Sequence, residues 1–188
     1  MRRLSLDMKK YGLEHLKTAR FADYTDDDID RLTDALTAEM IAPRIPRMRF
    51  GWGVKSWLFG LGRCDKCGKC CTYNSELPDD PGVMVRDEDL VKISKRTRHS
   101  LKSLLNMTKV NTDPTYKIGG RCLPRPCVFF DNNTRRCKIY GVRPLVCQLY
   151  PLSHDQEGAV FVDVQCDYGR EIFRKAIKHL REEEKRTE

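Results

Sequence analysis

The sequence contains no long hydrophobic run. Its longest apolar stretches are three or four residues, such as residues 128–130 and 159–162, whereas a membrane-spanning helix needs about 20 apolar residues. The N-terminal segment MRRLSLDMKK also lacks the hydrophobic stretch of a secretory signal. We therefore expect a soluble, cytoplasmic protein without a transmembrane segment.

Familiar nucleotide-binding and catalytic motifs are also missing. The sequence has no Gly-x4-Gly-Lys-Ser/Thr, Gly-x-Ser-x-Gly or Gly-x-Gly-x2-Gly motif. The four histidines stand at no spacing typical of metal or catalytic sites, so we interpret them as surface or packing residues; they are His15, His99, His154 and His179. No catalytic residue is predicted.

Positive charge is in excess but is nowhere concentrated along the chain. The 35 Lys and Arg exceed the 27 Asp and Glu, which leaves a formal charge of +8. Basic and acidic residues number 12 and 9 in 1–63, 7 and 7 in 64–100, 9 and 5 in 101–166, and 7 and 6 in 167–188. Since no block of like charge marks a polybasic arm, we interpret the charges as a mixed, solvated surface and do not expect a nucleic-acid partner.

Cysteine is absent from the first 63 residues and abundant afterwards. The nine cysteines are Cys64, Cys67, Cys70, Cys71, Cys122, Cys127, Cys137, Cys147 and Cys166. An odd number of clustered cysteines, in a chain expected in the reducing cytosol, favours metal binding or redox chemistry over disulfides.

The pattern of apolar and turn residues predicts an α+β fold. Helices are expected after the cap Thr25, from residue 87, after the cap Ser100 and from Tyr168, with a turn at 78–82. Short strands are expected at 116–118, 128–130, 138–140 and 158–164. Four glycines in residues 50–62 argue against a stable helix there.

We expect a small, irregular, metal-stabilised domain because the core is thin. Charged residues make up 33% of the chain, and the hydrophobic 40% includes Cys and Tyr. The predicted division is an N-terminal helical and aromatic extension at 1–63, a cysteine-cluster metal-binding domain at 64–166 and a C-terminal amphipathic helix at 167–188.

The run Cys64-x2-Cys67-x2-Cys70 is the strongest functional signal. Thiolates are soft ligands, so zinc and iron–sulfur clusters are the candidates. The run matches the start of the bacterial ferredoxin pattern, but Asn74 stands where the fourth cysteine would be. A further ligand must therefore come from residues 122–166, whose cysteines lack the spacing of a second zinc knuckle. The spacing favours an iron–sulfur cluster over zinc.

Cys70 and Cys71 raise a geometric question. Neighbouring side chains of an extended segment point in opposite directions, so both rarely reach one metal ion. Nine cysteines permit two four-thiolate sites with one cysteine left over, or one site with several buried, inert thiols. The basic residues around the thiols would lower their pKa values and raise a cluster's reduction potential; these are Arg63, Lys66, Lys69, Arg121, Arg125, Arg135, Arg136, Lys138 and Arg143.

Two segments together resemble the zinc- or iron-chelating cysteine-cluster family of the YkgJ type. They are CDKCGKCC at 64–71 and CKIYGVRPLVCQLYP at 137–151, with CVFF at 127–130 between them. The chain departs from the family at Gln148, where Arg is usual. The resemblance covers residues 64–166, and with the motif it implies the metal ligands Cys64, Cys67, Cys70, Cys71, Cys127, Cys137, Cys147 and Cys166.

The function expected first is that of an iron–sulfur protein, with a 4Fe–4S cluster as the favoured cofactor and zinc as the alternative. It would serve electron transfer, or act as a redox accessory to a protein partner or a larger enzyme, as a component of an iron–sulfur oxidoreductase. The second function is a structural zinc module that presents its basic face to protein or RNA. The third function is a part in a protein-modifying system like that of the flagellin lysine methylases. It follows from the resemblance, because a flagellin lysine N-methylase group shares the cluster. The sequence indicates no oligomeric state.

Overall fold

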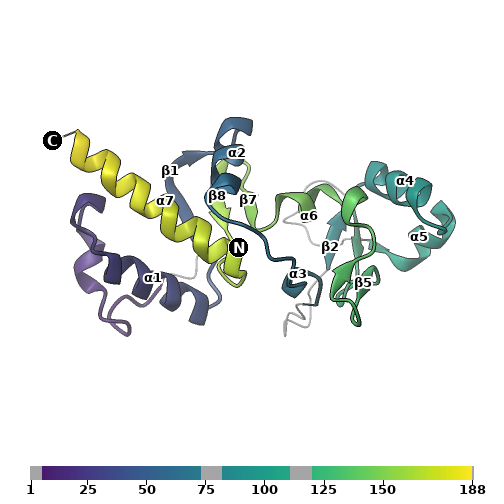
Figure 1. Cartoon of the computed structure of the whole chain (residues 1–188), viewed down its shortest axis with the longest axis horizontal. Helices are drawn as coiled ribbons and strands as arrows, with labels where there is room; N and C mark the ends of the chain where they lie inside the picture. The colour runs from purple at the N-terminus through teal and green to yellow at the C-terminus, as the bar shows by residue number, and fades with distance from the viewer. Residues whose placement is uncertain (1–5, 73–81, 111–119, 188) are drawn as a thin grey trace. The chain divides into compact units, whose positions relative to one another are not determined.

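The computed structural model describes residues 6–72, 82–110 and 120–187, which form two compact units (Figure 1). One unit is Lys66–Tyr150, and the other combines Arg2–Asp65 with Pro151–Glu188. Both contain helices and small antiparallel sheets, which confirms the predicted α+β class. These two compact units do not coincide with the predicted domains 1–63, 64–166 and 167–188. The predicted domain boundaries stay a prediction.

The unit made of Arg2–Asp65 and Pro151–Glu188, called here the terminal unit, is built on a three-stranded antiparallel sheet of order β1-β8-β7. Its elements are η1 (Glu14–Lys17), η2 (Phe21–Asp23), α1 (Asp26–Ala38), β1 (Arg44–Arg49), α2 (Trp52–Gly60), β7 (Leu152–His154), β8 (Ala159–Val162) and α7 (Asp167–Arg186). The predicted strand at 158–164 is thereby confirmed as β8.

Helices α1 and α7 begin and pack as their sequences predict. The Thr25 hydroxyl accepts a hydrogen bond from the Asp28 amide, and Asp28 accepts one from the Thr25 amide, which closes a capping box at the start of α1. Helix α7 buries one apolar stripe, made of Ile172, Phe173, Ala176, Ile177 and Leu180. Ion pairs such as Arg174 with Asp30 and Arg181 with Asp26 join the two helices.

The prediction that glycines would prevent a helix in residues 50–62 is wrong, because α2 spans Trp52–Gly60. Gly51 precedes the helix in extended conformation and Gly60 is its last residue, so most of the glycines lie at the ends, where they cost little. Between them Leu58 is fully buried. The Tyr168 hydroxyl of α7 donates a hydrogen bond of 2.9 Å to the Phe59 carbonyl, which ties α2 to α7.

The unit Lys66–Tyr150, called here the cysteine-cluster unit, is assembled from shorter elements. They are α3 (Lys69–Thr72), β2 (Val83–Val85), α4 (Asp87–Arg96), α5 (Leu101–Met107), β3 (Lys109–Val110), β4 (Arg121–Leu123), β5 (Phe130–Asp131), β6 (Arg136–Cys137), η3 (Tyr140–Val142) and α6 (Leu145–Leu149). Strands β2, β4 and β3 form one antiparallel sheet, and β5 and β6 form a hairpin. The predicted helices after residue 87 and after Ser100 are confirmed as α4 and α5.

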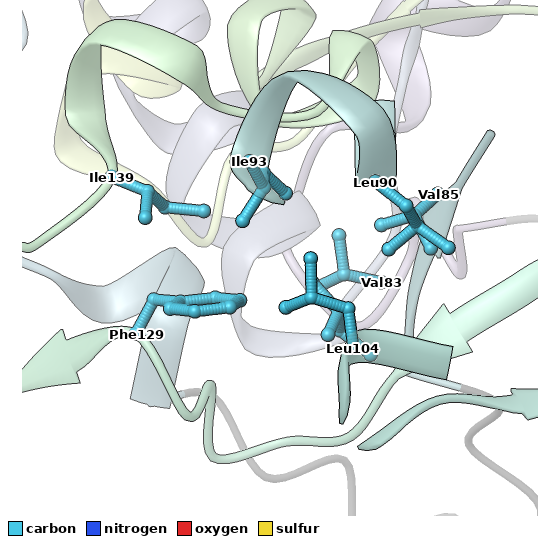
Figure 2. Close-up of a cluster of buried hydrophobic side chains, with 8 residues drawn as sticks. Val83, Val85, Leu90, Ile93, Leu104, Phe129 and Ile139 are labelled. Carbon is cyan, nitrogen blue, oxygen red and sulfur yellow. The ribbon is translucent and has the colours of Figure 1, made fainter. Parts of the chain in front are cut away.

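One hydrophobic cluster holds these short elements together (Figure 2). It joins Leu90 and Ile93 of α4 and Leu104 of α5 to side chains from β2, β4 and the cysteine-bearing segments; these are Val83, Val85, Leu123, Phe129 and Ile139. Three half-buried cysteines pack against the same cluster, namely Cys127, Cys137 and Cys147. The core therefore positions the second half of the cysteine motif.

The predicted hairpin exists, but its strands are displaced along the chain. Pairing runs from Phe130 opposite Cys137 to Asp131 opposite Arg136, whereas strands were expected at 128–130 and 138–140. The Asp131 carboxylate accepts hydrogen bonds from the amides of Asn133 and Thr134, so the turn starts at once after Asp131. The predicted strand at 116–118 and most of the predicted turn at 78–82 lie outside the described residues.

No helix among the described residues has the length and apolar character needed to cross a membrane.

The buried cluster gives a matched test on α5. Leu104→Ala should lower the free energy of unfolding by about 2–5 kcal/mol, because the Leu104 side chain is 0% exposed and its removal leaves a cavity. Leu101→Ala on the same helix should change it by no more than about 0.5 kcal/mol, because Leu101 is 41% exposed. Urea unfolding followed by circular dichroism measures both, and equal effects would contradict this core.

Candidate metal centre

Cys70 and Cys71 lie on one helical turn, not on an extended segment. The amides of Cys71 and Thr72 both donate to the Gly68 carbonyl, at 2.9 and 3.1 Å, which closes α3. In this conformation the Sγ atoms of Cys70 and Cys71 are 4.0 Å apart. The argument for opposite directions, which holds for an extended segment, therefore does not apply to this pair.

Cys127 joins this pair from a distant part of the sequence. Its amide donates a hydrogen bond of 2.8 Å to the Cys71 carbonyl, and the Cys71 and Cys127 thiols shift each other's pKa values. A backbone hydrogen bond thus joins the second cysteine-bearing segment to the first, next to the Cys70–Cys71 pair.

The hydrogen bonds among the three thiols move their pKa values in opposite directions. The pKa of Cys71 is raised, because its proton is shared with the sulfurs of Cys127 and Cys70. The pKa values of Cys70 and Cys127 are lowered, because each sulfur accepts from Cys71. The positive charge of Arg143 also lowers the pKa of Cys70, and that of Arg125 lowers the pKa of Cys127.

Cys137 and Cys147 lie within the electrostatic reach of these sulfurs. Burial raises the pKa of Cys147 to about 12 and also raises that of Cys137, and the charges of Cys127 and Cys70 raise both further. In the part of the chain that the structure describes, however, no three His, Cys, Asp or Glu side chains are grouped closely enough to hold a metal ion. The described structure thus brings these thiols within electrostatic range of one another but does not form a complete set of metal ligands.

Gly68 permits the turn that presents Cys70 and Cys71. Its φ is +79°, a conformation that side chains rarely adopt, and a Cβ atom would lie 2.3 Å from the ring of Phe130. The Arg135 guanidinium donates a hydrogen bond of 2.9 Å to the Cys67 carbonyl and lies over the same Phe130 ring. The β5–β6 hairpin therefore supports the first cysteine segment directly.

Tyr140 organises two of the cations near the thiols, and sequence reasoning missed it. The guanidinium of Arg143 lies 3.7 Å from the ring centroid of Tyr140, and the ammonium of Lys66 lies 5.0 Å from it. Arg143 also donates to the Tyr140 carbonyl at 3.0 Å. Gln148 donates its amide to the Arg143 carbonyl at 2.7 Å. The signal was present in the motif CKIYGVRP, where Tyr140 stands between basic residues.

The remaining predicted ligands have different surroundings. Cys64 is exposed and Cys166 is buried at the N-cap of α7, and both belong to the terminal unit. Cys67 is half-buried next to Gly68. Their role as ligands stays a prediction from the motif. Cys122, which was not predicted as a ligand, is buried within strand β4.

The histidines have structural surroundings, as predicted. His15 contacts the Asp28 carboxylate at 2.8 Å, and His154 packs against Phe50. His99 meets Phe129 edge-on, and His179 packs against Trp57.

The comparisons with known proteins identify the domain that carries these thiols. The sequence pattern of the CxxCxxCC family, described as "Putative zinc- or iron-chelating domain", matches residues 63–167. The chain belongs to this family. Thiolates suit both metals in that description, so the cysteines of the CxxCxxCC domain fit the group that the family implies.

One curated relative of the CxxCxxCC domain is an uncharacterized protein of Methanocaldococcus jannaschii, 35% identical over 94 residues. The alignment covers 48% of this chain and 44% of the relative, so the chain spans less than half of that protein's length. No solved structure matches the chain.

Two glycines of the cysteine-cluster unit test the role of the α3 turn. Gly68→Ala should reduce the metal content and lower the melting temperature, because the added Cβ meets Phe130 and the positive φ is strained. Gly141→Ala should change neither, because no atom lies within 4 Å of a Cβ at that position. Metal analysis and thermal unfolding of both variants measure the difference. Equal behaviour would show that the turn does not position the thiols.

The pKa directions predict the order in which thiols react. In metal-free folded protein at pH 7, iodoacetamide should modify Cys70 and Cys127 first, because their lowered pKa values favour the thiolate. Cys147 should react appreciably only in strongly alkaline solution, since its pKa is raised to about 12. Peptide mass spectrometry measures the rates, with urea-unfolded protein as the control in which the differences vanish. Uniform rates in the folded protein would contradict the arrangement of thiols.

Proposed function

We propose that the cysteine-cluster unit binds a metal centre through thiolates, with Cys70, Cys71 and Cys127 among its ligands. The observation that supports this most directly is the meeting of Cys127 with the Cys70–Cys71 pair. Cys137 and Cys147 are proposed as further ligands, because both pack on the same core and the charges of Cys127 and Cys70 raise their pKa values.

The separation of the adjacent sulfurs favours a single tetrahedral ion, which zinc forms most readily. Two thiolates bound to one tetrahedral zinc ion, each at about 2.3 Å from it, lie about 3.8 Å apart. The Sγ atoms of Cys70 and Cys71 are 4.0 Å apart before any adjustment. A bound zinc ion would link the two cysteine segments and so contribute to the stability of a unit whose strands have two or three residues.

The second candidate is an iron–sulfur cluster, such as a 4Fe–4S cluster, in electron transfer with a redox partner or a larger enzyme. The order Cys64-x2-Cys67-x2-Cys70 favours it. The charges of Arg143 and Arg125 near Cys70 and Cys127 favour it as well, because cations beside a cluster raise its reduction potential. A cluster would supply one-electron transfer, which zinc does not.

The test is elemental analysis of protein that has been purified without oxygen. Colourless protein with stoichiometric zinc is the expected result, whereas brown protein with matching iron and acid-labile sulfide would establish the second candidate. In either case Cys127→Ser should lose the metal and much of the folded structure. Cys122→Ser should keep the metal, because Cys122 lies inside β4 and outside the thiol group. Protein without stoichiometric metal, or equal metal content in both variants, would overturn the proposal.

A further inference from the structure

The net charge of the chain belongs entirely to the cysteine-cluster unit. Residues 66–150 contain 16 Lys and Arg but only 8 Asp and Glu, a net charge of +8. The other 103 residues contain 19 of each and are neutral. Charge counts over residues 64–100 and 101–166 do not show this difference in net charge. Both ranges include acidic residues of the terminal unit.

Within the basic unit, six cations fall in residues 92–109, which comprise most of α4, the turn after it, α5 and the start of β3. The exposed surface of this segment, called here the cationic face, carries Lys92, Lys95, Arg96, Arg98, Lys102 and Lys109. All six side chains belong to exposed residues, and residues 90–110 contain no Asp or Glu. Helices α4 and α5 lie side by side (Figure 1) and share the buried core of Figure 2.

The geometry of α4 directs its cations away from that core. Leu90 and Ile93 are fully buried. Lys92, Lys95 and Arg96 follow the spacing i, i+3, i+4, which places them together on the opposite side of the helix. Among the described residues, none of the six cations of the cationic face forms an ion pair with a carboxylate. The acidic residues of α4 lie in its first turn, where Asp89 caps the helix through the Arg86 amide.

Helix stability explains only part of this arrangement. Cations near the C-terminus of a helix are favoured by its dipole, which accounts for Lys95 and Arg96. It does not account for Arg98, Lys102 or Lys109, which lie outside α4. Lys92 and Arg96 are moreover like charges at i, i+4, which destabilise a helix. A ligand with repeated negative charges would relieve the mutual repulsion of all six cations.

We propose that the cationic face binds the phosphate backbone of nucleic acid. Closely spaced Lys and Arg side chains are the groups that neutralise successive phosphates and release their counterions. Arg96 and Arg98 can in addition bind phosphate oxygens in the bidentate manner of a guanidinium. The proposal adds a function to the metal centre and does not depend on which metal is bound, because none of the six residues is a proposed metal ligand. Lys109 is paired across β3 and β4 with Cys122, which is not among those ligands.

The face fits other polyanionic partners less well. Protein interfaces are enriched in exposed Trp, Tyr, Phe and Met at their centre, and residues 87–110 contain no Trp, Tyr or Phe. A helix that lies on a membrane inserts an apolar side. The apolar side of α4, Leu90 and Ile93, is buried in the core of its own unit. The exposed apolar residues beside the cations, Val91, Leu101 and Val110, come from three different elements and form no single apolar helix side.

The test uses full-length protein and a fluorescein-labelled, mixed-sequence single-stranded RNA of about 20 nucleotides. Fluorescence anisotropy should show binding whose affinity falls as potassium chloride rises. With all six cations on phosphates, the slope of log K against log salt would approach about −4, from about −0.7 per phosphate for single strands. A labelled DNA duplex of similar length should bind with a slope nearer about −5.

Matched variants locate the binding surface. The fourfold variant Lys92→Gln, Lys95→Gln, Arg96→Gln and Lys102→Gln should weaken RNA binding at least about tenfold and make the slope shallower by about 3. The control removes the same charge from exposed residues of the terminal unit, through Lys9→Gln, Lys17→Gln, Arg44→Gln and Arg49→Gln. Its affinity and slope should stay close to those of the unmodified protein. Circular dichroism and metal content verify that both variants are folded.

Three results would overturn the proposal. One is an absence of salt-dependent RNA binding by folded protein with its metal. Another is an equal loss of affinity in the two fourfold variants, which would assign binding to total charge. The third is tighter binding to poly-glutamate of equal charge, or to phosphatidylserine vesicles, than to RNA. Since metal content is measured on the same samples, a failure of the metal proposal is seen separately.

Discussion

The hydrogen bond from the Cys127 amide to the Cys71 carbonyl is the contact on which the candidate site depends. It joins two segments that are far apart in the sequence and brings Cys127 next to the segment that carries Cys70 and Cys71. Because each thiol on its own is a weak interaction partner, their proximity must be imposed by the backbone. Two features hold the thiols near one another. One is the Cys71–Cys127 hydrogen bond, and the other is the hydrophobic cluster against which Cys127, Cys137 and Cys147 pack.

The two units of the chain achieve stability by different means. In the terminal unit, long helices bury a continuous apolar stripe, and ion pairs between α1 and α7 neutralise their charges. The cysteine-cluster unit has short strands, one modest core and an uncompensated positive charge. Such a unit gains most from partners that bring opposite charge. Thiolates near Arg125 and Arg143 supply some of it inside the unit, and a polyanion at the cationic face would supply more outside.

Local sequence rules succeeded where one short-range interaction decides the structure. The Thr25–Asp28 capping box, the Ser100 cap and the apolar stripe of α7 were all predictable, because each involves residues within a few turns of one helix. The rules failed for α2 and for the β5–β6 hairpin. The glycines of residues 50–62 lie mostly at the ends of α2, where they do not prevent a helix. The turn after Asp131 starts earlier than the apolar pattern predicted.

The sequence by itself determined the family, the α+β class and the type of donor. The motifs Cys64–Cys71 and Cys137–Pro151 are continuous in the sequence, so they can be recognised without a structure. Only the tertiary structure decided that Cys70 and Cys71 lie on a helical turn with their sulfurs 4.0 Å apart, and that Cys127 joins them. It also decided that the whole excess charge belongs to one unit. The physical reason is the same in each case: sulfur separations and surface charge depend on which distant segments pack together, and no local pattern encodes that packing.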